Sequence, residues 1–418
     1  MTWGSGMAET LKAGILSRIP KTRMQETNRS ALGIIFLTIF INMVGFGVVI
    51  PVLPFYAERF GATPWEIGWL FGIFSLIQFL AAPLLGQISD RFGRRPVLII
   101  STLGTALGFT IMGAGQSLAM LFAGRIIDGI SGGSIGAAQA YVADITAPEN
   151  RSKAMGLIGA AFGLGFVFGP ALGGATAAWL GESAPLYLAG ALALANAVLI
   201  FFVLPESLPK ERRGPKKAPL FPDILQHVRP GPYFTTVATY FILIAGFSIM
   251  TVVFALFVAR RYGFNTAETG YVFAMLGVIG VVIQGGLIGR LVKTFGEARL
   301  ATAGAAILTA SLFAMPFTTS VPMLLLACAG IATGNSLLSP TLSGIASRNV
   351  DAEWQGRALG ILQSAGSLAR WIGPVLGGWL LTFDLNKNIA AYAQTPFWVA
   401  SGLLLLTFLL CLRLPKEK

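Results

Sequence analysis

The sequence predicts an all-α membrane protein, with twelve transmembrane helices in two pseudo-symmetric halves of six. Hydrophobic residues make up 55% of the 418 positions and charged residues only 11%, whereas soluble domains carry about a quarter charged residues. Twelve apolar stretches are each long enough to span a bilayer, which takes about 20 residues of helix. Motifs of the first half recur in the second half at fixed spacing, which indicates a duplicated bundle.

The apolar stretches are expected to be helices rather than strands. Lipid-exposed spans must be helices or closed barrels, because every backbone polar group needs a partner within the protein. Barrel strands are about 10 residues long with alternating polarity, and these stretches are longer and continuous. The predicted spans lie near residues 31–53, 66–87, 96–116, 118–142, 153–178, 184–204, 233–257, 267–290, 299–317, 321–346, 356–382 and 394–412.

The net charge of +12 indicates membrane topology rather than nucleic-acid binding. If both termini and every even-to-odd connection lie on one side, that side holds 24 of the 30 Lys and Arg residues. This asymmetry is the positive-inside pattern, so we expect an inner-membrane protein with both termini cytoplasmic. The remaining basic residues are Arg59, Arg260, Arg261 and Lys387 in the opposite loops, and Arg125 and Arg370 inside predicted helices.

The chain offers little for metal or enzyme chemistry. Cys328 and Cys411 both lie in apolar segments, where they act as small buried hydrophobic residues, and no disulfide between them is expected. His227 is the only histidine, so no histidine-based metal site is expected. The sequence holds no H-E-x-x-H and no G-x-S-x-G motif. We therefore predict no metal, no cofactor and no enzyme activity.

The apolar pattern divides the chain into two bundles, two tails and a linker. The bundles are predicted at 31–204 and 233–412, and the polar linker between them, at 205–232, contains PESLPKERRGPKKAP. The tails at 1–30 and 413–418 are expected to be cytoplasmic, and the first shows no cleavable signal peptide. Apolar residues at helical spacing in the first tail leave two possibilities, a helix on the membrane surface or a disordered segment.

Repeated motifs support the duplication. A parallel repeat of six helices places a substrate site between the two halves. The matched stretches are GATPWEIGWLFG (61–72) with GFNTAETGYVFA (263–274), and RSKAMG (151–156) and GFVFGPALGG (165–174) with QGRALG (355–360) and ARWIGPVLGG (369–378), the last two at a constant offset of 204 residues.

Further motifs carry a resemblance to a known family. The stretches GQISDRFGRRPV (86–97) and GRIIDGISGG (124–133) resemble signatures of the major facilitator superfamily, and residues 156–174 match the antiporter signature G-x8-G-x3-GP-x2-GG in full. The stretches IPVLPFY, AYVADIT and LPES resemble the tetracycline/proton antiporters. The resemblance covers nearly the whole chain. It implies a monomeric carrier that exports a small amphipathic molecule or drug in exchange for protons.

The chain departs from the tetracycline exporters at two positions. Asn42 stands where those exporters carry an aspartate, and the region near Gly108 lacks their membrane aspartate in the third helix. We therefore expect a general drug or metabolite exporter rather than a tetracycline–metal exporter. The alternative within the same fold is a symporter, a facilitator or a lipid translocator.

The resemblance implies a latch that holds the two halves together on the cytoplasmic side. We expect Arg94 to pair with Asp144, and Arg357 to reach Asp90 from the other half. The alternative is that these charges only determine topology. The second-half equivalent, GRLVKTFGEAR (289–299), has Lys293 at the aspartate position and is expected to be degenerate. The assigned residues are Gly86, Asp90, Arg91, Gly93, Arg94, Arg95, Asp144 and Arg357.

The antiporter signature lies on the fifth predicted helix. Its glycines at every fourth position form one smooth stripe, and small residues allow helices to approach closely in lipid. The helix is therefore expected to act as a pivot between the halves, or simply to pack tightly. The signature residues are Gly156, Gly165, Gly169, Pro170, Gly173 and Gly174.

Arg125 and Asp128 are expected to share one face of the fourth helix, because they are three residues apart. Ionisable groups at this depth cost several kcal/mol unless they are paired or hydrated, so they usually face a cavity. We expect Asp128 to bind and release the coupling proton and Arg125 to tune its proton affinity. A structural salt bridge and a direct substrate contact are the alternatives.

Arg370 stands alone in the eleventh helix, where the first half has Phe166 at the matching position. It is expected to bind an anionic or polarised substrate group, to pair with Asp128, or to extend toward the membrane interface. Polar and aromatic residues in other spans either satisfy one another or line the substrate cavity. These candidates are Asn42, Phe46, Gln139, Gln284, Asn335, Gln363 and Trp371.

Overall fold

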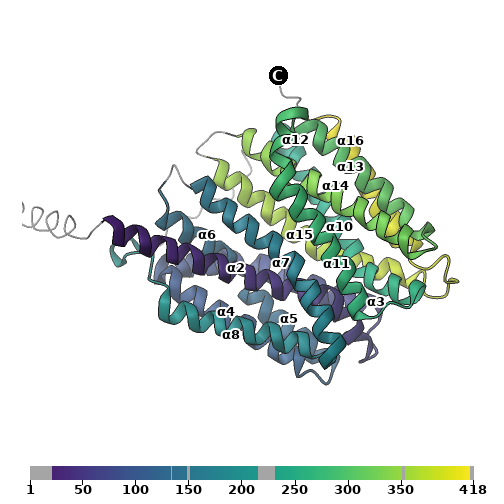
Figure 1. Ribbon diagram of the computed structural model, residues 1–418, viewed down its shortest axis with the longest axis horizontal. Helices are drawn as coiled ribbons and strands as arrows, with labels where there is room; N and C mark the ends of the chain where they lie inside the picture. Colours follow the sequence, from purple (N-terminus) through teal and green to yellow (C-terminus); the bar gives the residue numbers. More distant parts are fainter. Residues whose placement is uncertain (1–20, 133, 148–150, 215–230, 351–353, 415–418) are drawn as a thin grey trace, which may run out of the picture.

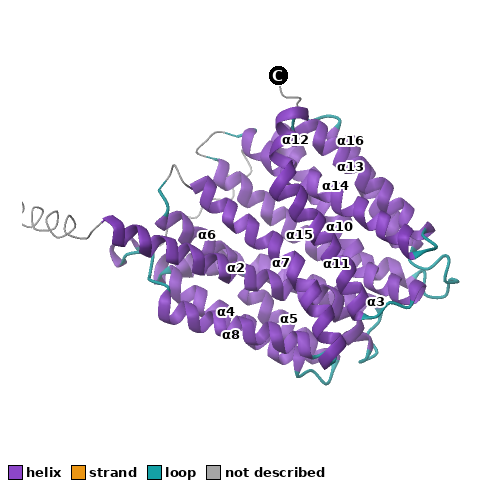
Figure 2. Ribbon diagram, in the orientation of Figure 1, coloured by secondary structure: helices purple, strands orange, loops and turns teal. Residues whose placement is uncertain are grey.

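The computed structural model describes residues 21–132, 134–147, 151–214, 231–350 and 354–414. Within these ranges all regular secondary structure is helical (Figure 2). Parts of both predicted tails and most of the predicted linker fall outside them. The two groups of helices lie side by side, the first coloured purple to teal and the second green to yellow (Figure 1).

The first half contains six helical segments, one of which is interrupted. The predicted span 118–142 is divided into α5 and α6 on either side of residues 132 and 133. The other five segments are continuous, and the first begins earlier than predicted. The helices are α2 (Lys21–Glu58), α3 (Pro64–Phe92), α4 (Arg94–Gly113), α5 (Leu118–Ser131), α6 (Ser134–Ile145), α7 (Arg151–Leu180) and α8 (Ala184–Val203).

The second half also contains six segments, and its second one includes a stretch of π-helix. Short 3₁₀ turns occur at Lys210–Arg212 and Met315–Phe317. The elements are α10 (Pro232–Tyr262), α11 (Thr266–Val281), the π-helix η3 (Val282–Leu287), α12 (Ile288–Phe295), α13 (Glu297–Ala314), α14 (Val321–Arg348), α15 (Gln355–Thr382) and α16 (Gln394–Cys411).

Eleven of these segments are long and apolar enough to cross a membrane, within the part of the chain that was described. The twelfth, α15, is 28 residues long, but it carries Gln363, Ser367 and Arg370 in its middle. The predicted class, an all-helical protein of twelve membrane helices, is confirmed.

Matching helix starts show the repeat at the level of local structure. Thr63 and Glu66 form a capping box at the start of α3, and Asn265 and Glu268 form one at the start of α11. In both, the glutamate accepts a hydrogen bond from the cap backbone N–H at 2.8 Å. A capping box satisfies two backbone donors that a helix start leaves free. The paired motifs therefore begin equivalent helices in the same way.

Successive membrane segments run antiparallel, with α5 and α6 counted as one segment and α11, η3 and α12 as another, so α2 begins and α16 ends on the same side of the bundle. We call this side the terminal face. It also holds the connection between α3 and α4 and residues 204–214, since the Glu206 carboxylate accepts a hydrogen bond from the Arg94 backbone N–H at 2.9 Å.

The hydrophobic core joins the halves only away from the terminal face. One large cluster combines residues such as Val48 and Leu53 of the first half with Phe254 and Phe257 of the second. Toward the terminal face, the first half has its own cluster around Ile35, Leu98 and Tyr141, whereas in the second half the large cluster continues to residues such as Tyr233 and Ala358, with a small cluster of Ile283, Leu300 and Leu337 beside it. The first-half members of the large cluster all lie away from the terminal face, so the halves share a core only there.

Helices α3 and α15 make one of the two main contacts between the halves. A Cβ atom at Gly72 would lie 3.0 Å from the Trp371 carbonyl oxygen, and one at Gly68 would touch the Pro374 carbonyl. The rings of Trp69 and Trp371 also meet, with centroids 6.4 Å apart. These residues belong to the half of each helix that lies farther from the terminal face.

Helices α7 and α11 make the other contact. A Cβ at Gly174 would lie 2.9 Å from the Ala267 carbonyl oxygen, and one at Gly277 would lie 2.8 Å from the Cα of Val167. The contact weakens toward the terminal face, where a Cβ at Gly163 would reach Val281 at 3.6 Å.

Closer to the terminal face than these contacts, α3, α15, α7 and the segment formed by α11, η3 and α12 carry glycines that have no neighbouring atoms. No neighbouring heavy atom lies within 4 Å of a Cβ placed at any of them, so these positions border open space. They are Gly86 on α3, Gly156 and Gly159 on α7, Gly285 and Gly286 in η3, Gly289 on α12 and Gly360 on α15. The halves are therefore in contact on one side and apart at the terminal face.

The glycine stripe of α7 packs within its own half. A Cβ at Gly169 would lie 2.7 Å from the Cα of Gly47 on α2, and one at Gly173 would lie 3.1 Å from the Cα of Val48. A Cβ at Gly165 would collide with Met43. A neighbouring face of α7, which includes Gly174, contacts α11 of the second half. Tight packing and contact between halves therefore use two different faces of the same helix.

Replacing Gly169 with leucine should destabilise the protein by about 1–3 kcal/mol, because the new side chain must displace the α2 backbone. Gly402→Leu is the matched control, since Gly402 lies on α16 with no atom within 4 Å of its Cβ. Thermal unfolding in detergent measures both. Equal midpoints for the two variants would contradict the observed contact between α7 and α2.

Candidate functional site

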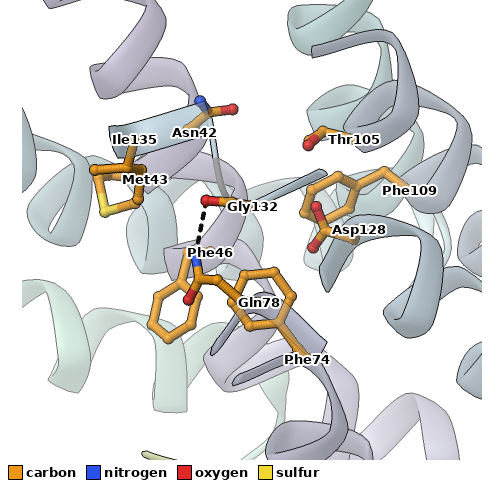
Figure 3. A pocket seen from close by; sticks show the side chains of 10 residues that line it. All are labelled: Asn42, Met43, Phe46, Phe74, Gln78, Thr105, Phe109, Asp128, Gly132 and Ile135. Carbon is orange, nitrogen blue, oxygen red and sulfur yellow. Dashed lines mark hydrogen bonds between the residues drawn. The ribbon is translucent and has the colours of Figure 1, made fainter. Parts of the chain in front are cut away.

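A small cavity lies inside the first half at mid-helix depth (Figure 3). Its volume is about 30 Å³, which suits one or two water molecules rather than a drug-sized ligand. The lining comes from all of the helices α2 to α6, and it includes two of the predicted cavity residues, Asn42 and Phe46. The full lining is Asn42, Met43, Phe46, Phe74, Gln78, Thr105, Phe109, Asp128, Gly132 and Ile135.

Arg125 and Asp128 form the predicted ion pair, with Arg125 Nη1 and Asp128 Oδ2 3.4 Å apart. Both side chains are buried, with 1% and 8% of their surface exposed. Arg125 also donates from Nε to the Leu70 carbonyl oxygen at 3.0 Å and lies over the Phe74 ring at 4.4 Å. Two contacts with α3 therefore hold the guanidinium in place independently of the carboxylate.

Asp128 faces the cavity, and sequence reasoning missed two of its neighbours. Thr105 lines the same cavity as Asp128, and both side chains point toward the same space (Figure 3). A Cβ at Gly108 would lie 3.1 Å from the Asp128 Cβ, so glycine allows α4 to approach closely. Asp128 thus has three kinds of neighbour: a cation, a hydroxyl group and room for water.

The interruption between α5 and α6 lies one turn beyond Asp128. Gln78 Nε2 donates to the Gly132 carbonyl oxygen at 2.9 Å (Figure 3). This bond satisfies a backbone acceptor near the end of α5, which would otherwise be exposed within the membrane.

At the terminal face, Arg94 lies at the centre of a charge cluster. Arg94 is 4% exposed, and its guanidinium contacts Asp90 at 2.6 Å, Asp144 at 3.2 Å and the Ser89 hydroxyl at 3.1 Å. The predicted pair of Arg94 with Asp144 is thus present. Glu206 caps the start of α4 through the backbone N–H groups of Arg94 and Arg95.

The rest of the predicted latch is arranged around this cluster. Gly93 has φ +111°, and a Cβ there would collide with Glu206, so glycine is needed for this turn. Arg95 donates to the Phe201 carbonyl oxygen, and Arg91 lies over the Phe92 ring at 5.4 Å. All of these contacts lie within the first half.

Arg357 does not reach Asp90 in this structure. Its side chain is exposed and lies over the ring of Trp354, 5.2 Å from the centroid. Among the described residues, Arg357 has no ion pair with an acid of the first half. The physical reason is the separation of the halves at the terminal face, since Gly86 and Gly360 on the same two helices also have no neighbour.

The second half has its own helix-end ion pair, with the charges exchanged. Glu297, at the start of α13, pairs with Arg348, at the end of α14. By the alignment of GRLVKTFGEAR with GQISDRFGRRP, Glu297 corresponds to Arg94, and Arg348 corresponds to Asp144 within a residue. The aspartate position is indeed a lysine, yet the pairing between the third and fourth helices of the half is retained.

Arg370 lies on α15 beside the contact between the halves. It donates from Nη2 to the Ser367 hydroxyl at 3.2 Å, and it lies beside Tyr240 of α10, since a Cβ at Gly366 would be 3.4 Å from Arg370 Nη1 and 3.0 Å from the Tyr240 ring. Asp128 is paired with Arg125, so the alternative pair of Arg370 with Asp128 is not formed here.

The remaining predicted cavity residues are divided between several environments. Gln284 lies in the π-helix and donates to the Ser336 hydroxyl at 3.4 Å, so it contacts its own half. Trp371 packs against Trp69, and its buried Nε1 has no hydrogen-bond partner among the described residues. Gln139 and Gln363 are exposed, and Asn335 is partly buried. Across the residues that the structure covers, no cluster of three or more metal-ligating side chains is found.

Known proteins resemble this chain over most of its length. A family model described as the Major Facilitator Superfamily matches residues 35–373 and 286–418. Multidrug resistance protein 2 of Bacillus subtilis (strain 168) is 34% identical over 362 residues, which cover 84% of this chain and 88% of the relative. The class C tetracycline resistance protein of Escherichia coli is 34% identical over 361 residues, covering 84% and 89%.

A solved structure agrees with these sequence relatives. The crystal structure of the human organic anion transporter MFSD10 (TETRAN) matches with a TM-score of 0.69 and 28% identity, over 92% of this chain and 99% of that one. The resemblance found in the sequence motifs is thereby confirmed. The protein is a multi-pass membrane transporter rather than an enzyme, and it belongs to the Major Facilitator Superfamily.

Proposed function

We propose that this protein is a secondary active transporter that exports a small amphipathic molecule in exchange for protons, by alternating access. The observation that carries the proposal is the interface between the halves, which is closed on one side and open at the terminal face. The names of the relatives, which include multidrug, tetracycline and organic anion proteins, support a small-molecule substrate. Export across the inner membrane, with the terminal face in the cytoplasm, agrees with the distribution of Lys and Arg.

The register of α3 against α15 indicates which residues would meet if the terminal face closed. Gly68 faces Pro374 and Gly72 faces Trp371. The two helices are therefore antiparallel at this contact, and a higher residue number on α3 is matched by a correspondingly lower number on α15. Continued toward the terminal face, this register puts Gly86 opposite Arg357. Asp90 follows one turn later on the same face of α3. Closure would therefore bring Arg357 to Asp90, as the latch requires.

The register of α7 against α11 gives the same result. Gly174 faces Ala267 and Gly163 faces Val281. Continued toward the terminal face, the register puts Gly159 opposite Gly285 and Gly156 beside Gly289, all of which have open space in this structure. Small residues on both surfaces allow close helix contact in lipid. The open glycines thus form a second interface, which we assign to the state that is closed at the terminal face.

Asp128 is the proposed site of the coupling proton. It is the one acidic residue at mid-helix depth in the described helices; the others lie near helix ends or in connections. Arg125 has contacts with Leu70 and Phe74 that do not involve Asp128, which favours a titrating carboxylate over a purely structural salt bridge. The adjacent cavity would supply water for proton exchange.

Asp128→Asn should abolish uphill transport driven by a pH gradient and leave downhill equilibration intact, because the proton site is lost while the alternating interfaces remain. Liposomes with an imposed pH gradient, loaded with ethidium or fluorescein as cationic and anionic probes, measure this. Glu182→Gln is the control, since Glu182 pairs with Arg59 at 2.9 Å outside the cavity. Undiminished uphill export by Asp128→Asn would refute the assignment of the proton site. If the wild-type protein moved the probe in the same direction as the protons, it would be a symporter.

Gly159→Leu should reduce transport at least about tenfold and leave thermal stability unchanged. The new side chain has space in the observed state, but it would block the closed interface, where overpacking costs about 1–3 kcal/mol. Gly402→Leu, on a helix outside both interfaces, should transport normally. If Gly159→Leu were as active as the control, the proposed second interface would be wrong.

A further inference from the structure

Among the described residues, one positive charge at mid-helix depth has no carboxylate partner. Three charged residues lie at mid-helix depth in the described helices, namely Arg125, Asp128 and Arg370. Arg125 and Asp128 pair with each other. Arg370 remains, and an unpaired charge at this depth is costly unless it is hydrated or meets an anion.

The second half cannot neutralise Arg370 from its own sequence. Its membrane helices contain two acidic residues, Glu268 and Glu297, and both lie in the first turn of their helices. Each is occupied there, Glu268 in a capping box and Glu297 with Arg348. Neither lies at the depth of Arg370, which is sixteen residues into α15 by the bounds of that helix.

The polar groups found beside Arg370 are neutral hydroxyl-bearing side chains. Its guanidinium donates from Nη2 to Ser367 Oγ at 3.2 Å. Tyr240 lies next to it, since a Cβ at Gly366 would be 3.0 Å from the Tyr240 ring and 3.4 Å from Arg370 Nη1. A guanidinium has five N–H donors, so most of them remain available to an anion.

Arg370 occupies the sector of α15 that faces the centre of the molecule. Trp371, Pro374 and Gly378 contact α3, while Gly366, Gly373 and Gly377 contact α10. On a helical projection Arg370 falls between these two contact faces. Its side chain is half-buried rather than fully covered.

Arg370 also lies at the depth where the opening between the halves ends. The next residue, Trp371, makes the last glycine contact of α15 with α3 on the way to the terminal face, and it packs against Trp69. The α7–α11 contact similarly ends at Gly163 and Val281. A molecule that entered from the terminal face would meet Arg370 just before this closed end.

We propose that Arg370, with Tyr240 and Ser367, binds the carboxylate of an anionic small molecule, which is the transported substrate. This inference rests on the proposed transport function and specifies its substrate class. A guanidinium matches a carboxylate through two parallel hydrogen bonds, and the hydroxyls of Tyr240 and Ser367 supply further donors. Trp371 and Trp69 provide an apolar wall for the rest of an amphipathic molecule.

Three dansyl probes with one fluorophore and different charges test the proposal. They are dansylglycine, its neutral amide and the cationic dansylcadaverine, titrated against the purified full chain in a neutral detergent. Wild type should bind dansylglycine at least about tenfold more tightly than the amide, which corresponds to about 1.4 kcal/mol. Arg370→Gln should remove this preference and leave amide binding unchanged. Arg370→Lys should retain only part of it, because a lysine lacks the planar fork.

The contrary outcomes are equally specific. The proposal is overturned if wild type shows no carboxylate preference, or if folded Arg370→Gln keeps it. Should Arg370→Gln fail to fold, Tyr240→Phe together with Ser367→Ala must lower the preference several-fold, and an unchanged preference would count against the site. Displacement of dansylglycine by phosphatidylglycerol at equal concentration would assign the site to a lipid headgroup instead.

The same probes separate this inference from the transport function. If wild type prefers dansylglycine through Arg370 but never moves it uphill in liposomes with a pH gradient, the proposed function fails and the anion site stands. If wild type and Arg370→Gln both export dansylcadaverine uphill and neither distinguishes acid from amide, the anion site fails and proton-coupled export stands.

Discussion

Backbone contact at glycine joins the two halves, and the position of every other functional feature depends on it. In lipid no hydrophobic force draws helices together, so close packing of small residues must supply the attraction. Gly68 and Gly72 do this on α3, and Gly174 and Gly277 do it on α7 and α11. The same helical segments carry a second set of glycines toward the terminal face. The sequence thus carries two sets of glycines, of which one is in contact in this structure and the other is assigned by our proposal to a state closed at the terminal face.

The distribution of charge between the halves follows from this arrangement. The first half carries a carboxylate beside an arginine that is anchored by other groups, and the second carries Arg370 with hydroxyl neighbours. Burial and nearby charge both change the proton affinity of a carboxylate, and both change when the interface around it opens or closes. A proton site in one half and an anion site in the other would respond to the same movement, which is how binding at one can be coupled to the other.

At the terminal face, the two halves have an ion pair at equivalent helix ends, but the positive and negative residues have exchanged places. Arg94 with Asp144 and Glu297 with Arg348 tie equivalent helix ends together with opposite polarity. Both segments remain net basic, with Arg91, Arg94 and Arg95 beside Asp90 in the first half and Arg290, Lys293 and Arg299 beside Glu297 in the second. Closure of the terminal face would therefore depend on individual opposite charges, such as Arg357 with Asp90, rather than on a net attraction between the halves.

Sequence reasoning predicted those features that depend on local pattern or composition, including the twelve helices and the pairing of Arg125 with Asp128 three residues away. It missed features that depend on tertiary contact. The carbonyl at Gly132 needs Gln78 from another helix, and the stripe at Gly169 could not reveal which neighbour it touches. The absent contact of Arg357 with Asp90 has a different cause. Motifs record contacts from every state that a protein visits, whereas one structure displays the contacts of a single state. Because Arg357 and Asp90 are in register across the open interface, their contact stays a prediction for a state that is closed at the terminal face.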